Sequence, residues 1–414
     1  MTTASAIASP LPDRVLSVDV FRALTILGMI FVNELGQGFL KDVPAWLRHA
    51  PADVSAMTVA DLVFPAFLFI VGLAIPLALD RRRARGWPLH RVLRHIIGRT
   101  FGLLVLGVFM VNLHTLDPAA TGLSRPVFEL LLYAGVILVL NRCPDAHGWR
   151  RVLWLTARGL GVVVLVLLAR QYRGTGPEGP VWLRTQWWGI LGLIGWAYLV
   201  SSLAYLATRG APAGLMGVLG LLVLLNIGDR CGALAALQPL REYVFLGGHI
   251  GGHASLTVAG MLVAVLMGLG GPGAGGGGAA RGGGVAAVSL LGLGLAAAGR
   301  LLEPLYGISK IKATPTWCLY SAALCTGLLL LLFLLVDRWR WTAWARPLQP
   351  VGANPLLAYI LPDIVYALLA VAGVRWLEEH FVVGGVAVAR AVIFAALMAG
   401  LTAVGTRLRI RLAL

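Results

Sequence analysis

The chain has 414 residues, of which 58% are hydrophobic and 13% charged, with a formal net charge of +16. Soluble domains carry roughly 25% charged residues, so this composition excludes an ordinary soluble domain, and mean hydropathy is +0.84. The apolar residues fall in blocks of about 20, the length of a helix that crosses a bilayer. Because lipid offers no partner to backbone groups, we expect an all-α polytopic transmembrane helical bundle of about 11–12 spans.

The candidate spans follow one another along the whole sequence. They cover residues 17–36, 58–79, 95–113, 125–141, 151–169, 187–207, 211–227, 243–268, 285–300, 316–336, 351–371 and 385–406. The blocks at 211–227 and 285–300 are short and rich in glycine, so eleven spans is the alternative to twelve. The first block begins with Asp19 and Arg22 and is followed by further spans, so we expect it to stay as a transmembrane helix rather than be cleaved.

One low-complexity stretch interrupts the spans. Residues 269–284 are mostly glycine, which is typical of a flexible linker because glycine buries too little surface to become ordered. We expect a cytoplasmic linker here, within a single integral-membrane domain that covers residues 1–414. A phosphate-binding glycine loop is disfavoured because no Lys-Ser/Thr pair follows.

The positive charge lies in short loops between the apolar blocks. Arginine in such loops marks the cytoplasmic side of a membrane protein, and the densest run is Arg81-Arg82-Arg83-Ala84-Arg85. Counting spans from this loop places both ends of the chain inside and residues 37–57 and 301–315 outside. We therefore expect an integral membrane protein with a cytoplasmic N-terminus, with membrane lipid and not nucleic acid as its partner. Few lysines against many arginines and alanines suggest a GC-rich bacterial genome, so the expected location is a bacterial inner membrane.

Four polar side chains gather near the outer membrane face in the first 80 residues. Asn33 and Glu34 lie near the end of the first span, His49 lies in the outer loop, and Asp61 lies near the start of the second span. Polar groups at membrane depth cost about 2.5–3.5 kcal/mol at a helix centre and usually face protein or water. The pattern indicates a functional site, although a solvated histidine is the simpler interpretation of His49 taken alone.

Several motifs, in order, resemble those of the heparan-α-glucosaminide N-acetyltransferase family of transmembrane acyltransferases. The strongest are Ser17-Val-Asp-Val-Phe-Arg22, Met29-Ile-Phe-Val-Asn33, His49-Ala50 and Thr58-Val-Ala-Asp61-Leu-Val-Phe-Pro65. Looser matches are Trp187–Tyr198, Ile308-Ser-Lys310 followed by Trp317, and Gly352–Tyr359. Pro51, Ala52 and Asp53 stand where the family often has tryptophan and asparagine.

The resemblance implies that His49 is the catalytic histidine and that acetyl-CoA is the acyl donor. A side chain with an ordinary pKa of about 6.5 suits proton transfer near neutral pH. Asp61 could orient its ring, as the acid does in a hydrolase triad, and Asn33 could stabilise the oxyanion. His49 acts either as base or as a transiently acetylated nucleophile, and the sequence leaves both open.

Further candidates lie outside the first 80 residues. We assign Glu34, His249, His253, Lys310 and Asp363 to the acceptor, and Arg22, Arg94, Arg99 and Asn354 to the donor. Arginine forks match phosphate groups of a nucleotide, although the same arginines could simply set topology. Glu129 is a further pocket candidate. His249-x-x-x-His253 lacks the other ligands of a metal site, and the four cysteines form no metal motif, so we expect no metal.

The sequence thus predicts transfer of an acetyl group from cytosolic acetyl-CoA to an amine or hydroxyl of an extracytoplasmic sugar or glycan. An ion-coupled transporter of a sugar-like solute is the alternative, because carriers also use buried acids and broken helices. A scaffold or sensor with a degenerate site is a third. Assembly as a homodimer is left open.

Overall fold

The computed structural model describes residues 15–142, 147–177, 179–269 and 278–413. Over these residues the chain is helical, with no strand and only isolated bridges such as Lys41 with Val383. The prediction of an all-α polytopic bundle is confirmed.

The helices that build the bundle share a largely apolar sequence. They are α1 (Leu16–Leu35), α2 (Val59–Ala84), α3 (Leu89–Asn112), α5 (Arg125–Leu140), α6 (Trp149–Gln171), α7 (Gly189–Thr208), α8 (Pro212–Arg230), η4 (Leu246–His253) continuing into α9 (Ala254–Leu266), α10 (Gly278–Tyr306), α11 (Pro315–Leu332) continuing into η5 (Phe333–Arg338), α12 (Gln349–Ala353), α13 (Pro355–Val371) and α15 (Gly384–Arg407). Short helices lie in the connections: η1 (Ala45–Leu47), η2 (Leu113–Thr115), α4 (Pro118–Thr121), η3 (Ala235–Glu242), η6 (Ala343–Leu348) and α14 (Trp376–Glu379).

Each predicted span corresponds to a helix, although not every helix is long enough to cross a membrane. Among the described residues, ten helices are long and apolar enough to cross, and eleven if the pair Ala343–Ala353 and Pro355–Val371, bent by 78°, counts as one span. Helix α5 has 16 residues, about 24 Å at 1.5 Å per residue, which is shorter than a bilayer core of about 30 Å. The lower predicted number therefore fits better.

The predicted glycine linker is partly wrong. Residues 270–277 lie outside the described part, but α10 begins at Gly278, so the last residues of the expected linker are helical. Glycine disfavours a helix by about 1 kcal/mol relative to alanine. Here Gly284 lies so close to the carbonyl oxygen of Leu266 that a Cβ would be 2.7 Å from it, and the helix gains a close contact with α9.

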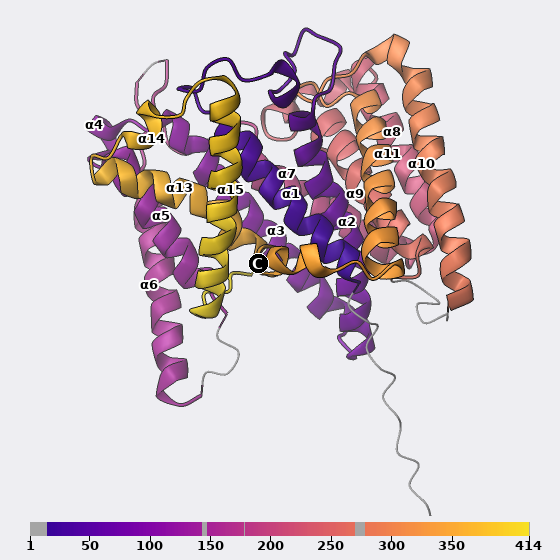
Figure 1. The fold of residues 1–414 in the computed structure, drawn as a ribbon, viewed down its shortest axis with the longest axis horizontal. Coiled ribbons are helices and arrows are strands. Elements are labelled where there is room, and N and C mark those ends of the chain that lie inside the picture. Colours follow the sequence, from indigo (N-terminus) through magenta and orange to yellow (C-terminus); the bar gives the residue numbers. More distant parts are fainter. Residues whose placement is uncertain (1–14, 143–146, 178, 270–277, 414) are drawn as a thin grey trace, which may run out of the picture.

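The helices form a central group and an outer rim. The span Leu246–Leu266 is 78% buried and α6 only 11% buried, so α9 lies inside and α6 faces outward at one edge (Figure 1). The start of α1, the end of α15 and the arginine-containing turn 81–87 lie on one side, which we call the arginine-rich side. The loop 36–58 lies on the opposite side, the His49 side (Figure 1).

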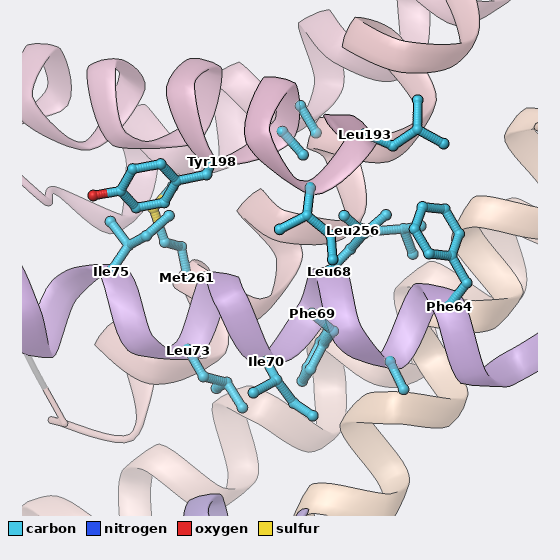
Figure 2. Packing of buried hydrophobic residues seen from close by; sticks show 14 of the residues in the cluster. Phe64, Leu68, Phe69, Ile70, Leu73, Ile75, Leu193, Tyr198, Leu256 and Met261 are labelled. Carbon is cyan, nitrogen blue, oxygen red and sulfur yellow. The ribbon is translucent and has the colours of Figure 1, made fainter. Parts of the chain in front are cut away.

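Helices α2 and α9 make the tightest contact of the core. Figure 2 shows Leu68, Phe69 and Leu73 of α2 in the apolar cluster to which Leu256 and Met261 of α9 belong. The two backbones touch at glycines, because a Cβ at Gly72 would collide with the carbonyl oxygen of Thr257 and one at Gly260 with that of Phe69. This contact fixes α2, which carries Asp61 in its first turn.

We expect Gly72→Ala to lower the free energy of unfolding by about 1–3 kcal/mol, the usual cost of overpacking a core. Unfolding in mixed micelles with increasing SDS measures the effect. Gly98→Ala on α3, where nothing lies within 4 Å of an added Cβ, is the matched control and should be neutral or slightly stabilising. Equal stability of the two variants would contradict the packing described here.

Candidate active site

The first turn of α2 holds a buried carboxylate that organises the preceding loop. Asp61 is 1% exposed, and its Oδ2 accepts hydrogen bonds from the N–H groups of Ala50 at 3.1 Å and Thr58 at 3.2 Å. An acid three residues after a threonine N-cap commonly accepts from the backbone in this way. The residue that caps α2 therefore also fixes the end of the loop that carries His49.

His49 uses one ring nitrogen to bind this acid. Its Nδ1 lies 2.8 Å from Oδ1 of Asp61, and 45% of its side chain is exposed. Because an ionised carboxylate can only accept hydrogen bonds, Nδ1 carries the proton and Nε2 presents a lone pair. The predicted pairing of His49 with Asp61 is thus a direct contact.

Lys310 completes the group from the loop between α10 and α11. Its Nζ lies 3.1 Å from Nδ1 and 3.2 Å from Nε2 of His49. The loop is attached to the His49 segment through Ile308, whose N–H donates to Ser55 Oγ at 2.9 Å and whose carbonyl accepts from Ala56 N–H at 3.2 Å. Burial lowers the pKa of Lys310 to about 8, although Asp61 acts in the opposite direction.

A cavity of about 440 Å³ opens beside His49, within the usual range of roughly 300–1,000 Å³ for small-molecule sites. It brings together five residues that the sequence analysis selected separately: Asn33, Glu34, His49, Glu129 and Asp363. They come from α1, the following loop, α5 and α13. The remaining predicted site residues do not line this cavity.

Glu34 is held by partners that the sequence did not reveal. Its Oε1 lies 2.7 Å from an Nη of Arg390 on α15, and both its oxygens accept from the Tyr366 hydroxyl at 2.8 Å. Arg390 and Glu34 are 6% and 1% exposed at their side chains. Arg390 also lies over the ring of Phe39 at 4.9 Å. Glu34 is therefore tied into a buried cluster as well as lining the cavity.

The other two acids have different partners. Asp363 accepts a short hydrogen bond from the hydroxyl of Tyr133 on α5, and no ion pair to Asp363 is found in the described chain. Glu129 pairs with Arg125 one helical turn earlier at 2.8 Å. Asp363 therefore has acceptor capacity left for a hydrogen-bonding ligand.

His249 and His253 lie behind Asp61 rather than in the cavity. Their rings stack with centroids 5.9 Å apart, and His253 packs edge-on against Phe64 and Trp317. Trp317 in turn donates from Nε1 to the Asp61 carbonyl at 3.3 Å. The pair supports the wall that carries Asp61, and the prediction that it contacts the acceptor stays untested.

The residues assigned to the donor lie away from His49. Arg22 binds Asp19 at 3.1 Å and the Gly352 carbonyl at 3.3 Å. Asn354 is 1% exposed, donates to Thr406 and the Ile410 carbonyl, and accepts from Leu412 N–H. Its amide anchors the C-terminal segment at the break between α12 and α13. Arg22 and Asn354 thus have structural contacts, and a role in donor binding stays a prediction.

Arg99 belongs to a basic cluster on the arginine-rich side, while Arg94 is exposed on the same helix. The Arg99 guanidinium lies over the Tyr198 ring at 4.6 Å, and the Arg99 Nε is buried without a hydrogen-bond partner in the described chain. Arg82 is close enough to interact electrostatically with both Arg99 and Arg142, and all three arginines act electrostatically on His95. Sequence reasoning missed Arg142 as a member, because the loop that brings it here is remote in sequence.

Two residues that line the cavity and one that binds Glu34 carried little signal in the sequence. Tyr133, Tyr366 and Arg390 sit within apolar spans, where a single polar residue is also consistent with ordinary helix packing. Arg390 could have been suspected, because an arginine inside a span usually needs a partner. Its pairing with Glu34, 356 residues earlier, requires the fold.

The fold and this site together define a polytopic membrane protein in which a histidine, an aspartate and a lysine are grouped beside a cavity lined in part by acids. The chain belongs to the family described as Domain of unknown function (DUF5009), whose model matches residues 14–223. That range includes His49, Asp61 and the whole of α1 to α3.

The chain is also similar to two curated proteins. It is 39% identical over 104 residues to the Homo sapiens heparan-alpha-glucosaminide N-acetyltransferase, a match that covers 25% of this chain and 15% of the human protein. It is 37% identical over 100 residues to the Mus musculus protein of the same name, covering 24% and 14%. The chain thus spans about one seventh of the length of these relatives. The resemblance predicted from the motifs is confirmed.

Proposed function

We propose that this chain transfers an acetyl group from acetyl-CoA to an amine or hydroxyl of a sugar or glycan on the His49 side of a bacterial inner membrane. The observation that carries the proposal is the His49 ring beside a cavity lined in part by acids. Its Nδ1 is bound to Asp61, and its Nε2 lies 3.2 Å from the Lys310 ammonium. The similarity to two acetyltransferases supports the same reaction class.

In this mechanism His49 Nε2 takes the proton of the acceptor as its nitrogen or oxygen attacks the thioester carbonyl. Asp61 stabilises the imidazolium that forms. The Lys310 ammonium or the Asn33 amide stabilises the oxyanion. The carbon–sulfur bond then breaks, and the thiolate of coenzyme A receives the proton from His49, so that the histidine returns to its starting form. A route through an acetylated His49 would use the same groups in two steps.

The donor has to approach from the arginine-rich side in this proposal, with the N-terminus cytoplasmic. The basic cluster of Arg82, Arg99 and Arg142 suits the phosphates of a nucleotide because guanidinium groups bind phosphate bidentately. On α1 the cavity reaches Met29, seven residues or roughly 10 Å along the helix from Arg22. We therefore expect helices around Met29 to move apart when the pantetheine arm enters.

Purified protein in detergent, given radiolabelled acetyl-CoA and a mixture of amino sugars, tests the reaction itself. The proposal predicts release of free coenzyme A thiol together with label on a sugar. Neither thiol release nor labelled sugar, from protein whose thermal unfolding is cooperative, would contradict it.

The transporter alternative gains no support from the broken helix. Carriers use a break such as the one between α12 and α13 to hold ions. Here the Asn354 amide at the break is instead hydrogen-bonded to the C-terminal segment. We therefore do not propose transport.

Lys310 gives the site an expected pH dependence. Its ammonium is present at pH 7 and is lost as the pH rises through about 8, so kcat should fall above that pH. Lys310→Met should lower kcat by about 10²-fold at pH 7 and abolish this fall, whereas Lys310→Arg should keep its charge to higher pH. Initial rates from pH 6 to 9.5 measure the profile.

Lys312→Met is the matched control, because Lys312 is exposed in the same loop. It should keep the wild-type profile. An unchanged profile in Lys310→Met would show that this ammonium takes no part.

A further inference from the structure

Trp187 is a large exposed side chain at the same cavity as His49. It is 51% exposed and lines the cavity from the segment just before α7. Within the described chain it has no hydrogen bond and no ring contact. Its indole is therefore free for a ligand in the cavity.

The neighbours of Trp187 are fixed in an unusual turn. Gln186 and Trp188 have φ angles of 46° and 70°, values that residues with side chains rarely adopt and that often mark functional sites. Gln186 donates from Nε2 to Asn112 Oδ1 at 3.1 Å. Trp188 donates from Nε1 to the Tyr243 carbonyl and packs edge-on against Trp196. The residues on both sides are thus anchored, while Trp187 is left open.

The cavity combines this free aromatic ring with hydrogen-bonding acids. Asp363 and Glu129 line the same space, and carboxylates accept hydrogen bonds from hydroxyl groups. A sugar ring carries hydroxyls around its edge and apolar C–H groups on its faces. An aromatic ring is a suitable partner for such an apolar face, because it supplies a large rigid contact area.

We propose that Trp187 is a specificity-determining residue that stacks on the six-membered ring of a sugar acceptor. The inference rests on the proposed function for the identity of the site. The inference adds to the proposed function that the site selects pyranosides over open-chain amines and alcohols. The competing role for an exposed tryptophan near a membrane surface is that of a lipid-headgroup anchor.

Binding of methyl β-glucosaminide to the full chain in detergent tests this directly by saturation-transfer NMR. Serinol, which has the amine and hydroxyls but no ring, is the comparison probe. We expect saturation of the sugar H1, H3 and H5 protons, which share one ring face, and roughly tenfold weaker binding in Trp187→Ala. Trp187→Phe should retain most of the affinity.

Trp182→Ala is the matched control, since Trp182 is 60% exposed in the same connecting segment but does not line the cavity. It should bind the sugar like the wild type, and serinol should bind equally to all variants. Equal sugar binding by Trp187→Ala and wild type, or no sugar binding by the wild type, would overturn the proposal. Sugar binding that depends on Trp187 without acetyl transfer would instead count against the proposed reaction alone.

Discussion

Replacing His49 with alanine is expected to lower kcat for acetyl transfer by about 10²–10⁴-fold, the usual contribution of a positioned general base. The reason is the bond between Nδ1 and Asp61, which leaves Nε2 as the basic atom at the cavity mouth. Radiolabelled transfer under saturating acetyl-CoA measures the loss. Stability should change little, since 45% of the side chain is exposed.

Two further variants test whether the loss of activity is specific to His49 and its contact with Asp61. Asp61→Asn should also lower kcat strongly, because the amide can donate to Nδ1 and favour the wrong tautomer. His380→Ala, an exposed histidine beyond α14 that stacks on Trp376, should be as active as the wild type. Wild-type kcat in His49→Ala would remove the histidine from the mechanism.

Replacing Arg390 with methionine is expected to lower the free energy of unfolding by about 3–5 kcal/mol, the usual cost of leaving one member of a buried ion pair alone. Glu34 would keep only the Tyr366 hydroxyl as its hydrogen-bond partner in the described chain. SDS-induced unfolding in mixed micelles measures the change.

The double variant Glu34→Gln with Arg390→Met should recover most of this loss, because it removes both charges. Arg375→Met breaks the exposed pair with Glu378 and should cost no more than about 1 kcal/mol. Equal stability of Arg390→Met and Arg375→Met would contradict a buried ion pair between α1 and α15.

Local sequence was sufficient for the part of the site built within α1, the next loop and α2. Asp61 and His49 are only twelve residues apart, and both were expected at the outer membrane face, where the loop after the first span meets the second span. Apolar block length likewise predicted the helices, because a membrane imposes nearly the same length on each span.

The rest depends on contacts between distant segments. Tyr133 binds Asp363 from 230 residues away, and Lys310 meets His49 across 261 residues. No local pattern specifies such pairs. The residues from Gly278 onward show a second kind of error. Their composition predicts a linker, but packing against α9 supports a helix.

Transfer across a sealed membrane tests the central claim most directly. The experiment uses a Cys143→Ser variant in proteoliposomes. An impermeant maleimide that labels Cys231, which is exposed at the end of α8, sorts the vesicles by the orientation of the protein. Acetyl-CoA with a radiolabelled acetyl group is sealed inside, on the arginine-rich side, and an amino sugar is added outside, on the His49 side. We expect labelled sugar outside, coenzyme A retained inside, and no product with His49→Ala. Product formed only when donor and acceptor share one side would contradict it.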